Sequence, residues 1–454
     1  MKTTALFVTL ALLSFFISYT QAEPIKLTDV SGNFSVTVEV VDVRGSSVRF
    51  KRADGTTGLV PITKLDKGSL LRAINALDSP WDIEIIKSTM AIRVNPGDAT
   101  AYYTRGFSYL QKDEFDKALA DYSKALELNP KDADVYYRAR ANVFLAKDNT
   151  DKAISEYSKM ISLKPKDFIG YHLRGGAHLQ KREFGTAIAD FTEAIELEPK
   201  EGAAFFYRGL AYRGLVEINK AIADFSKTIE LIPKGAAGRF LRELAYYERG
   251  VSYLDNRNFD QAIADFTKIL VMDKFGNSPP TVPVAKAYAK RAKAYFQKGD
   301  FDKAIADFTE AINLVPGYIS ALNLRGLAYR QLGDLDKALA DYNKAIELDP
   351  KYVFAYSNRG YVFFAQGNFD KAIVDYSKAI EIAPKDANAY FNRGLAYGKK
   401  NEHDKAIADY GKVIEIDPTD FNTYFNRGLA YRAKGDKVKA DADFAKAKEL
   451  GYKP

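Results

Sequence analysis

The sequence predicts a mainly α-helical protein, a solenoid of helix-turn-helix repeats that follows a small N-terminal β-barrel-like module. Two observations lead to this fold class. A motif of 34 residues recurs ten times between Ala99 and Pro454, and a unit this short cannot bury its own apolar face unless neighbouring units stack. Ahead of the repeats, apolar and polar residues alternate with the period of a half-buried strand.

The first 22 residues have the pattern of an export signal. Lys2 provides a positive start, Ala5 to Tyr19 are mostly apolar, and Ala22 offers a small residue at the cleavage point. The alternative is a membrane anchor, but a spanning helix needs about 20 apolar residues. We therefore expect residues 1–22 to be removed and the mature chain, with no membrane span, to be exported to a periplasm or secreted.

Residues 23–66 predict a small β module. Val36, Val38 and Val40 alternate with polar residues, and Asp54-Gly55 is a hairpin signal. Together with Gly32-x-Phe34, Lys51-Arg52-Ala53-Asp54-Gly55, Val60-Pro61 and Leu65, this segment resembles the small Src-homology-3-like module of a yeast endocytic adaptor and of exported bacterial proteins. The resemblance implies a peptide-binding or a purely adhesive role. The segment shows no recognisable aromatic groove, which favours the structural role.

Residues 67–98 change to a helical pattern. Ile85, Ile92 and Val94 fall where the second helix of a repeat has its apolar residues, and Trp81 lies on or near the first turn. We interpret this segment as a degenerate leading repeat, with a plain linker helix as the alternative.

Each recurring residue of the motif has a physical reason. We begin the repeats at Ala99, Asp134, Phe168, Gly202, Glu243, Ala285, Ile319, Val353, Ala387 and Phe421 and count places from these residues. Place 8 is Gly or Ala and place 20 is always Ala, which predicts that two helices touch there. Place 24 is always Tyr or Phe, a core position. Proline near place 32 ends the second helix, and Asp132, Asp167, Asp386 and Asp420 could cap the next one.

This pattern resembles the tetratricopeptide repeat over about three quarters of the chain. The resemblance implies a right-handed superhelical solenoid whose first helices line a concave face at places 2, 5, 6, 9, 12 and 13. It also implies binding of other proteins through peptide segments.

Charged residues of both signs recur inside the motif. Place 7 is arginine in all ten repeats and place 23 is acidic in all ten. The arginines are Arg105, Arg140, Arg174, Arg208, Arg249, Arg291, Arg325, Arg359, Arg393 and Arg427, and the acids include Asp121, Glu156, Asp341, Asp375, Asp409 and Asp443. A functional interpretation is an arginine-lined surface for anions. We favour a structural ladder between the two helices or between neighbouring repeats, with about 0–1 kcal/mol per exposed pair.

Two insertions interrupt the register. One, near Ala236 to Arg242, should lengthen the first helix of the fifth repeat. The other, 277–284, carries three prolines and predicts a stiff non-helical connector and a hinge. The array would then divide into repeats 1–5 (99–276) and repeats 6–10 (285–454). In the last helix, Asp441 and Lys448 replace residues that are apolar in other repeats, so this helix should cap the array.

The predicted concave groove contains aromatic residues and is basic, because its cationic residues outnumber its two acids, Glu248 and Asp255. Its candidate binding residues are Arg138, Asn142, Lys286, Lys290, Lys293, Arg330, Asn358, Asn392, Lys399, Asn426 and Arg432. Asn358, Asn392 and Asn426 share place 6, and a row of amides can hold an extended peptide backbone; it resembles the asparagine ladder of O-linked N-acetylglucosamine transferases. The alternative is that Asn is simply common there. Arg138 with Asn142 gives a weak hint of the family's carboxylate clamp.

Composition narrows the function classes. The chain has no cysteine, which excludes disulfides, thiolate nucleophiles and cysteine-ligated metals. Its net charge is only +7, so nucleic acid is not expected. No phosphate loop, nucleophile elbow or metal-ligand spacing is present, which predicts no enzyme, no cofactor and no metal.

The sequence therefore predicts a non-enzymatic scaffold that binds peptide segments of other proteins, acidic ones in particular. One alternative is an accessory or recruitment factor in cell-envelope or polysaccharide assembly, and another is a polyanion-binding protein.

Overall fold

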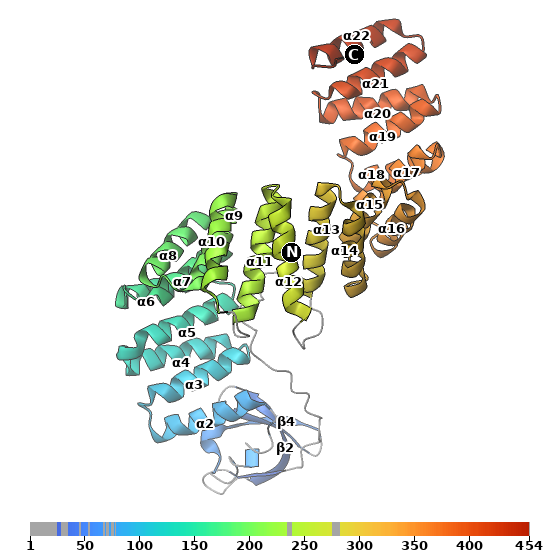
Figure 1. The fold of residues 1–454 in the computed structure, drawn as a ribbon. Coiled ribbons are helices and arrows are strands. Elements are labelled where there is room, and N and C mark those ends of the chain that lie inside the picture. The colour runs from blue at the N-terminus through green and yellow to red at the C-terminus, as the bar shows by residue number, and fades with distance from the viewer. Residues whose placement is uncertain are drawn as a thin grey trace. The chain divides into compact units, whose positions relative to one another are not determined.

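The computed structural model describes residues 25–28, 35–44, 47–52, 55–66, 69, 72–73, 77, 79–233, 238–274 and 282–453. The predicted signal peptide, 1–22, lies outside these residues. The chain forms two compact units, Met1–Pro233 and Lys234–Pro454, whose helix pairs are drawn in Figure 1. Each unit is described by itself.

The first unit begins with a four-stranded antiparallel sheet. Its strands β1 (Ile25–Thr28), β2 (Ser35–Arg44), β3 (Ser47–Lys51) and β4 (Thr57–Pro61) pair in sequence order. Phe50 lies opposite Gly58, and a Cβ atom on Gly58 would come within 2.6 Å of the Phe50 ring. Glycine therefore lets this ring lie across β4. The predicted strands are present, while closure into a Src-homology-3-like barrel stays a prediction.

The sheet shares its core with the first repeat. A short 3-10 helix, η1 (Ile62–Lys64), leads towards α2 (Pro80–Val94), which packs on η1, β2 and the next helix. Val48 and Phe50 from the sheet, Ile85 from α2 and Tyr122 from repeat 1 belong to one buried cluster. The β module is thus joined to the repeat array by a continuous apolar core and is not an independent domain.

Pairs of antiparallel helices make up the rest of the described chain. In the first unit these are α3 (Ala99–Gln111), α4 (Phe115–Leu128), α5 (Ala133–Ala146), α6 (Thr150–Leu163), α7 (Phe168–Gln180), α8 (Phe184–Leu197), α9 (Gly202–Gly214) and α10 (Ile218–Leu231). In the second unit they are α11 (Arg239–Asp255), α12 (Phe259–Lys274), α13 (Val282–Lys298), α14 (Phe301–Leu314), α15 (Ile319–Gln331), α16 (Leu335–Leu348), α17 (Val353–Ala365), α18 (Phe369–Ile382), α19 (Ala387–Lys399), α20 (His403–Ile416), α21 (Phe421–Ala433) and α22 (Lys437–Glu449). This is the predicted fold class.

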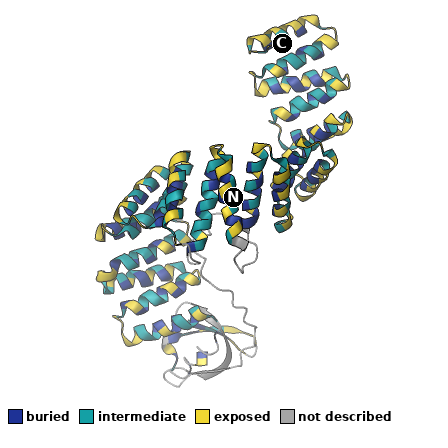
Figure 2. Cartoon of the chain, viewed as in Figure 1, coloured by how far each residue is buried: buried dark blue, intermediate teal, exposed yellow. Residues whose placement is uncertain are grey.

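Small residues and rings hold each pair together, as the sequence predicts. A Cβ atom on Gly326 of α15 would lie 2.7 Å from the Tyr342 ring of α16, and the same is true of Gly428 against Phe444. Ala338 and Tyr342 are completely buried. Figure 2 shows the buried residues running along the helix pairs. Close packing of this kind fixes how the two helices of a repeat cross.

Three of the four aspartates that the sequence predicts as N-caps do cap a helix. Asp167, Asp386 and Asp420 accept backbone N–H groups at helix starts, as expected for N-caps. Asp132 does not, because it ends a short 3-10 helix, η2 (Pro130–Asp132), that leads directly into α5.

The turn inside each repeat needs a left-handed residue. In repeat 7 this residue is Gly333. In repeat 4 the corresponding residue is Val216, which adopts the left-handed conformation (φ +62°) although it is not a glycine.

The two insertions behave differently. The fifth repeat has the predicted long first helix, since α11 contains 17 residues. The connector is not non-helical throughout: Val282–Val284 belong to α13, because proline is tolerated in the first turn of a helix. Residues 275–281 lie outside the described residues. Phe266 of α12 and Val284 of α13 share one buried cluster, and the boundary between compact units falls after Pro233, not in the predicted connector.

The last repeat has a polar outer side. Asp441 and Lys448 of α22 are exposed. After α22 the chain turns back, and the Tyr452 ring stacks on Phe425 of α21 with their centroids 4.2 Å apart. Tyr452 therefore covers an aromatic residue of the last repeat that would otherwise be more open to water.

Candidate functional site

The recurrent arginines form a ladder inside the repeats. In nine repeats the place-7 arginine donates through Nε and Nη2 to both carboxylate oxygens of the place-23 aspartate. In Arg174–Asp190 these distances are 2.9 and 2.7 Å, and in Arg325–Asp341 they are 2.9 and 2.7 Å. The nine pairs are Arg105–Asp121, Arg174–Asp190, Arg208–Asp224, Arg249–Asp265, Arg291–Asp307, Arg325–Asp341, Arg359–Asp375, Arg393–Asp409 and Arg427–Asp443. Each pair joins the two helices of one repeat.

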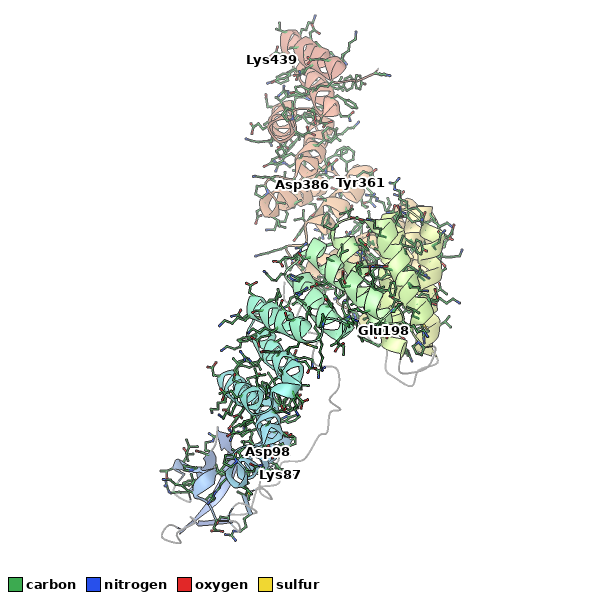
Figure 3. The ribbon with its side chains drawn as sticks, turned by 90° about the vertical axis from the view of Figure 1, so that its left-hand side faces the viewer. Lys87, Asp98, Glu198, Tyr361, Asp386 and Lys439 are labelled. Atoms are coloured by element: carbon green, nitrogen blue, oxygen red, sulfur yellow. The ribbon has the colours of Figure 1, made fainter. Side chains whose placement is uncertain are left out.

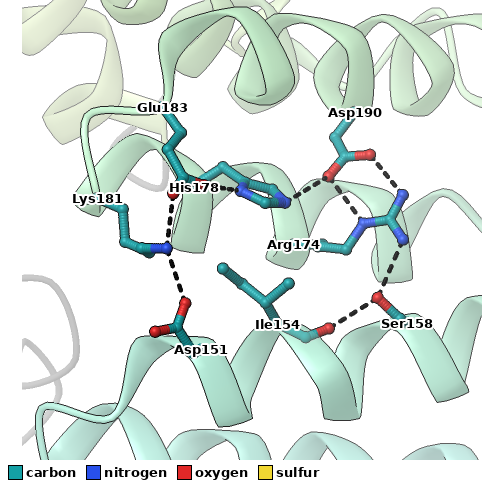
Figure 4. Close-up of polar contacts among 8 residues, drawn as sticks. All are labelled: Asp151, Ile154, Ser158, Arg174, His178, Lys181, Glu183 and Asp190. Carbon is teal, nitrogen blue, oxygen red and sulfur yellow. Dashed lines mark hydrogen bonds and ion pairs between the residues drawn. The ribbon is translucent and has the colours of Figure 1, made fainter.

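The same guanidinium also reaches the preceding repeat. Arg174 Nη1 donates to Ser158 Oγ at 3.1 Å, and Ser158 Oγ in turn donates to the carbonyl of Ile154 (Figure 4). Corresponding bonds run from Arg105, Arg208, Arg291, Arg325, Arg359 and Arg393 to Thr89, Thr192, Thr267, Thr309, Asn343 and Ser377. Thr89 lies on α2, so α2 occupies the position of a second helix. This favours the leading-repeat interpretation over a plain linker.

These arginines are structural groups. The side chain of Asp341 is 7% exposed and that of Arg325 is 17% exposed, so the pairs are more buried than the exposed pairs that we expected. The pKa of Arg174 is raised, chiefly because its guanidinium donates to the Asp190 carboxylate. With Nε, Nη1 and Nη2 all engaged, Arg174 has little capacity left for a ligand. We therefore exclude the ladder from the candidate site.

Repeat 2 breaks the pattern. Arg140 faces Glu156, and the Nε–Oε2 distance lengthens to 3.3 Å. Arg140 Nε and Glu156 Oε2 are buried without a hydrogen-bond partner. The extra methylene of Glu moves the carboxylate out of register with the guanidinium, and Lys159 binds the same carboxylate at 2.7 Å instead.

Sequence reasoning missed a second ladder. A lysine at the end of one first helix pairs with an aspartate in the first turn of the preceding second helix, as in Lys147–Asp116 and Lys181–Asp151, both at 2.7 Å. Lys181 also binds Glu183, which contacts His178 (Figure 4). The regular spacing of about 30 residues between the partners is a signal that could have revealed these pairs. The pairs neutralise lysines on the outside of the turns.

The predicted binding residues divide between the two units. Arg138 and Asn142 lie in Met1–Pro233, where Asn142 Oδ1 accepts a hydrogen bond from Tyr157 Oη at 3.2 Å. The other nine lie in Lys234–Pro454. We call the surface formed by places 2, 5, 6, 9, 12 and 13 of α13, α15, α17, α19 and α21 the inner face. Neighbouring members of this helix series contact one another, so the inner face is a continuous surface within one unit.

The inner face is basic. It holds six cationic side chains and no carboxylate, namely Lys286, Lys290, Lys293, Arg330, Lys399 and Arg432. Lys286, Lys293, Lys399 and Arg432 are exposed. Arg330 lies over the Tyr361 ring, with its Cζ 4.5 Å from the centroid.

The three asparagines do not form a uniform row. Asn358 Nδ2 donates to Asn323 Oδ1 at 2.9 Å, and Asn426 Nδ2 donates to the carbonyl of Asn422 at 2.8 Å. Asn392 makes no side-chain hydrogen bond to any residue that the structure describes. The three amides differ because place 5 of the preceding repeat differs: it is Asn323, Ser357 and Phe391 in turn. Only Asn392 retains all of its hydrogen-bonding capacity.

An open hollow lies at one edge of the inner face. It is lined by Val353, Phe354, Ser357, Ala383, Pro384, Lys385, Asp386 and Asn388. Phe354 is 64% exposed and Tyr361, on the same helix, is 47% exposed. Tyr361 and Asp386 can be located in Figure 3. Ser357 Oγ is buried without a hydrogen-bond partner, so an unused polar group lies at this hollow.

Among the described residues, no group of three or more His, Asp or Glu side chains is placed to hold a metal ion. In the same part of the chain, no helix is both long and apolar enough to cross a membrane.

Comparison with known proteins identifies the class of repeat. The geometry defines a helical-repeat protein that presents a basic surface. Family models described as "TPR repeat" match 292–333, 326–367 and 360–401, and models described as "Tetratricopeptide repeat" match 99–132, 172–236, 244–274, 387–420 and 410–442. These matches together span more than half of the chain, so the chain belongs to the tetratricopeptide-repeat family. Proteins of this family are protein-interaction scaffolds and are typically non-enzymatic.

Several solved structures are similar to the chain. The crystal structure of MamA is 33% identical, and the match covers 35% of this chain and 93% of that chain with a TM-score of 0.34. A tetratricopeptide repeat protein from Parabacteroides merdae ATCC 43184 is 23% identical over 55% of this chain and 93% of that chain, with a TM-score of 0.44. The APC/C hetero-tetramer Cut9–Hcn1 is 17% identical over 85% and 84%, with a TM-score of 0.41. None of the curated proteins matches the chain.

Proposed function

We propose that the inner face of repeats 6–10 binds extended segments of other proteins and prefers acidic ones. The observation that carries this proposal is the contrast in charge pairing. Many lysines at the turns and on the second helices are neutralised, as in Lys400–Asp370 and Lys344–Glu347. On the inner face, Lys286, Lys293 and Lys399 make no ion pair with any described residue. Unpaired cations on a surface without carboxylates attract an anionic partner.

The scaffold supports this role. The arginine ladder holds the two helices of each repeat together, so the inner-face side chains are not needed to hold the helices together. Because the first helices contact one another in series, a partner could run across several repeats and add up weak contacts.

Binding of displayed peptides tests the proposal. Random peptides selected on the full chain should be enriched in Asp and Glu. Reversal of four exposed charges, Lys286→Glu, Lys293→Glu, Lys399→Glu and Arg432→Glu, should weaken the selected peptides at least about tenfold. The matched control is Lys166→Glu, an exposed lysine in a loop of the other unit. Peptides that bind the charge-reversed protein as tightly as the original would refute the proposal.

The polyanion alternative gives a different result in the same assay. Heparin or polyphosphate would then compete with every selected peptide, and affinity would fall steeply with added salt without any preference among peptides.

We also propose that the chain is exported, on the strength of Lys2, the apolar run and Ala22. The first 22 residues fused to a reporter should direct it out of the cytoplasm and be cleaved after Ala22. N-terminal sequencing of the exported reporter checks the cleavage point, and a reporter retained in the cytoplasm would contradict this proposal.

A further inference from the structure

Two parallel stripes of side chains run along α17 and α19 on the inner face. Asn388, Asn392, Leu395 and Lys399 are spaced by four, three and four residues, so they share one line along α19. Phe354, Asn358 and Tyr361 hold the same places on α17, and α17 and α19 contact each other. The stripe on α17 has an aromatic ring on each side of an asparagine, and the stripe on α19 is mostly polar with a cation at its end.

The hollow beside Phe354 lies at the other end of these stripes. Phe354, Ala383 and Pro384 give it apolar walls, and it is open enough to take a side chain. Asp386 also lines the hollow, but its carboxylate accepts the backbone N–H groups of Asn388 and Ala389. The carboxylate is therefore used in capping α19.

Two polar groups without partners lie along these stripes, one at the hollow and one between the hollow and Lys399. Ser357 Oγ is buried and unpaired, and Asn392 makes no side-chain hydrogen bond with the described residues. Asn323 and Asn358 hold the same two places one repeat earlier, and there they bond to each other. A buried polar group without a partner is costly, and an extended backbone supplies both the donor and the acceptor that these two groups lack.

We propose, resting on the function proposed above, that this surface reads a defined spacing in its partner. The partner is an extended segment with a bulky apolar side chain in the hollow beside Phe354 and a carboxylate at Lys399. Asn388 and Lys399 are eleven residues apart on α19, or about 16 Å along a helix that rises 1.5 Å per residue. An extended chain advances about 3.3 Å per residue, so the two side chains are about five residues apart in the segment.

Selection of random displayed peptides on the full chain tests this spacing. The enriched peptides should share a bulky apolar residue and an Asp or Glu about five positions apart. Selection on the Lys399→Glu variant should replace the acidic residue by Lys or Arg, and selection on Phe354→Ala should lose the apolar residue. A synthetic peptide from the first selection should bind Lys399→Glu about tenfold more weakly and the Lys166→Glu control equally well.

Ser357→Ala separates binding from folding. Removing an unpaired hydroxyl should leave the melting temperature of the free protein unchanged or higher, yet weaken the synthetic peptide about threefold. Circular dichroism of each variant confirms that it is folded.

The outcomes distinguish this inference from the proposed function. Peptides that are acidic without a fixed spacing, or that bind Phe354→Ala and Ser357→Ala as tightly as the original, would overturn the inference and leave the general function standing. Peptides indifferent to the fourfold charge reversal would overturn both.

Discussion

Removal of one arginine of the ladder should destabilise its repeat far more than loss of an ordinary surface ion pair. In Arg325→Met, Asp341 keeps its buried position but loses both bonds from the guanidinium, and Thr309 loses the bond from Nη1. Breaking a fully buried pair costs about 3–5 kcal/mol. Because Arg325 is 17% exposed, we expect a loss of about 2–4 kcal/mol.

The assay is hydrogen exchange of α15 and α16, combined with urea denaturation of the full chain. Repeat arrays unfold locally, so exchange reports on the repeat that carries the change. Protection in residues 319–348 should fall, while α3 and α4 in the other unit keep theirs.

Two further variants make the reasoning refutable. Arg325→Met with Asp341→Leu removes both charges and should recover most of the loss, since it leaves no buried charge unpaired. Lys344→Met breaks an exposed pair with Glu347 and should cost less than about 0.5 kcal/mol. If Arg325→Met costs no more than Lys344→Met, or if the double variant is no more stable than the single one, then the buried carboxylate does not carry the energy.

Four other substitutions test separate positions. Glu156→Asp should stabilise repeat 2 by about 1 kcal/mol, because the shorter side chain can meet Arg140 with two bonds; an unchanged denaturation midpoint would contradict this. Gly326→Val should destabilise by about 1–3 kcal/mol, since its Cβ would lie 2.7 Å from a ring, whereas Gly176→Ala, with nothing within 4 Å, should stabilise by up to about 1 kcal/mol in thermal melts. Burial lowers the pKa of His172, so the stability that it contributes is complete above its unfolded pKa and is lost as the pH falls below about 6.5. His172→Phe should therefore reduce the loss of stability between about pH 7 and about pH 5, and identical pH profiles for the two proteins would count against it.

Local and repeated features could be predicted from the sequence. The residue types at places 7 and 23 suggested the pairing of Arg325 with Asp341, because opposite charges recur together at one spacing. The bond from Arg325 to Thr309 was not predicted, since place 25 holds Ser, Thr or Asn in eight repeats and Gly or Ala in the last two, and shows no charge pattern. The hydrogen bonds of a residue at one place also depend on the residue that lies near it in the preceding repeat. Asn392 and Asn358 both hold place 6 of their repeats. The preceding repeat has Ser357 at place 5 in the case of Asn392, whereas Asn358 bonds to Asn323 there.

Contacts between distant segments could not be predicted. The shared core of Phe50 and Tyr122 joins a strand to a helix more than seventy residues away, and alternation of apolar residues shows only that a face is buried, not what covers it. Pro283 favoured a non-helical connector, but the first turn of a helix does not need its N–H. The hollow beside Phe354 depends on a turn and a helix from two repeats, so no single motif contains it.

The hydrogen bond from most of the ladder arginines to the preceding repeat makes the contacts between repeats interchangeable. Seven arginines find a hydroxyl or amide oxygen at the same place of the preceding helix, and for Arg105 that helix is α2. If one repeat were duplicated or deleted, the arginine of the following repeat would in most cases still find an equivalent acceptor. The number of repeats can thus change in evolution without a new type of contact between repeats. The inner-face residues can diverge independently of these contacts.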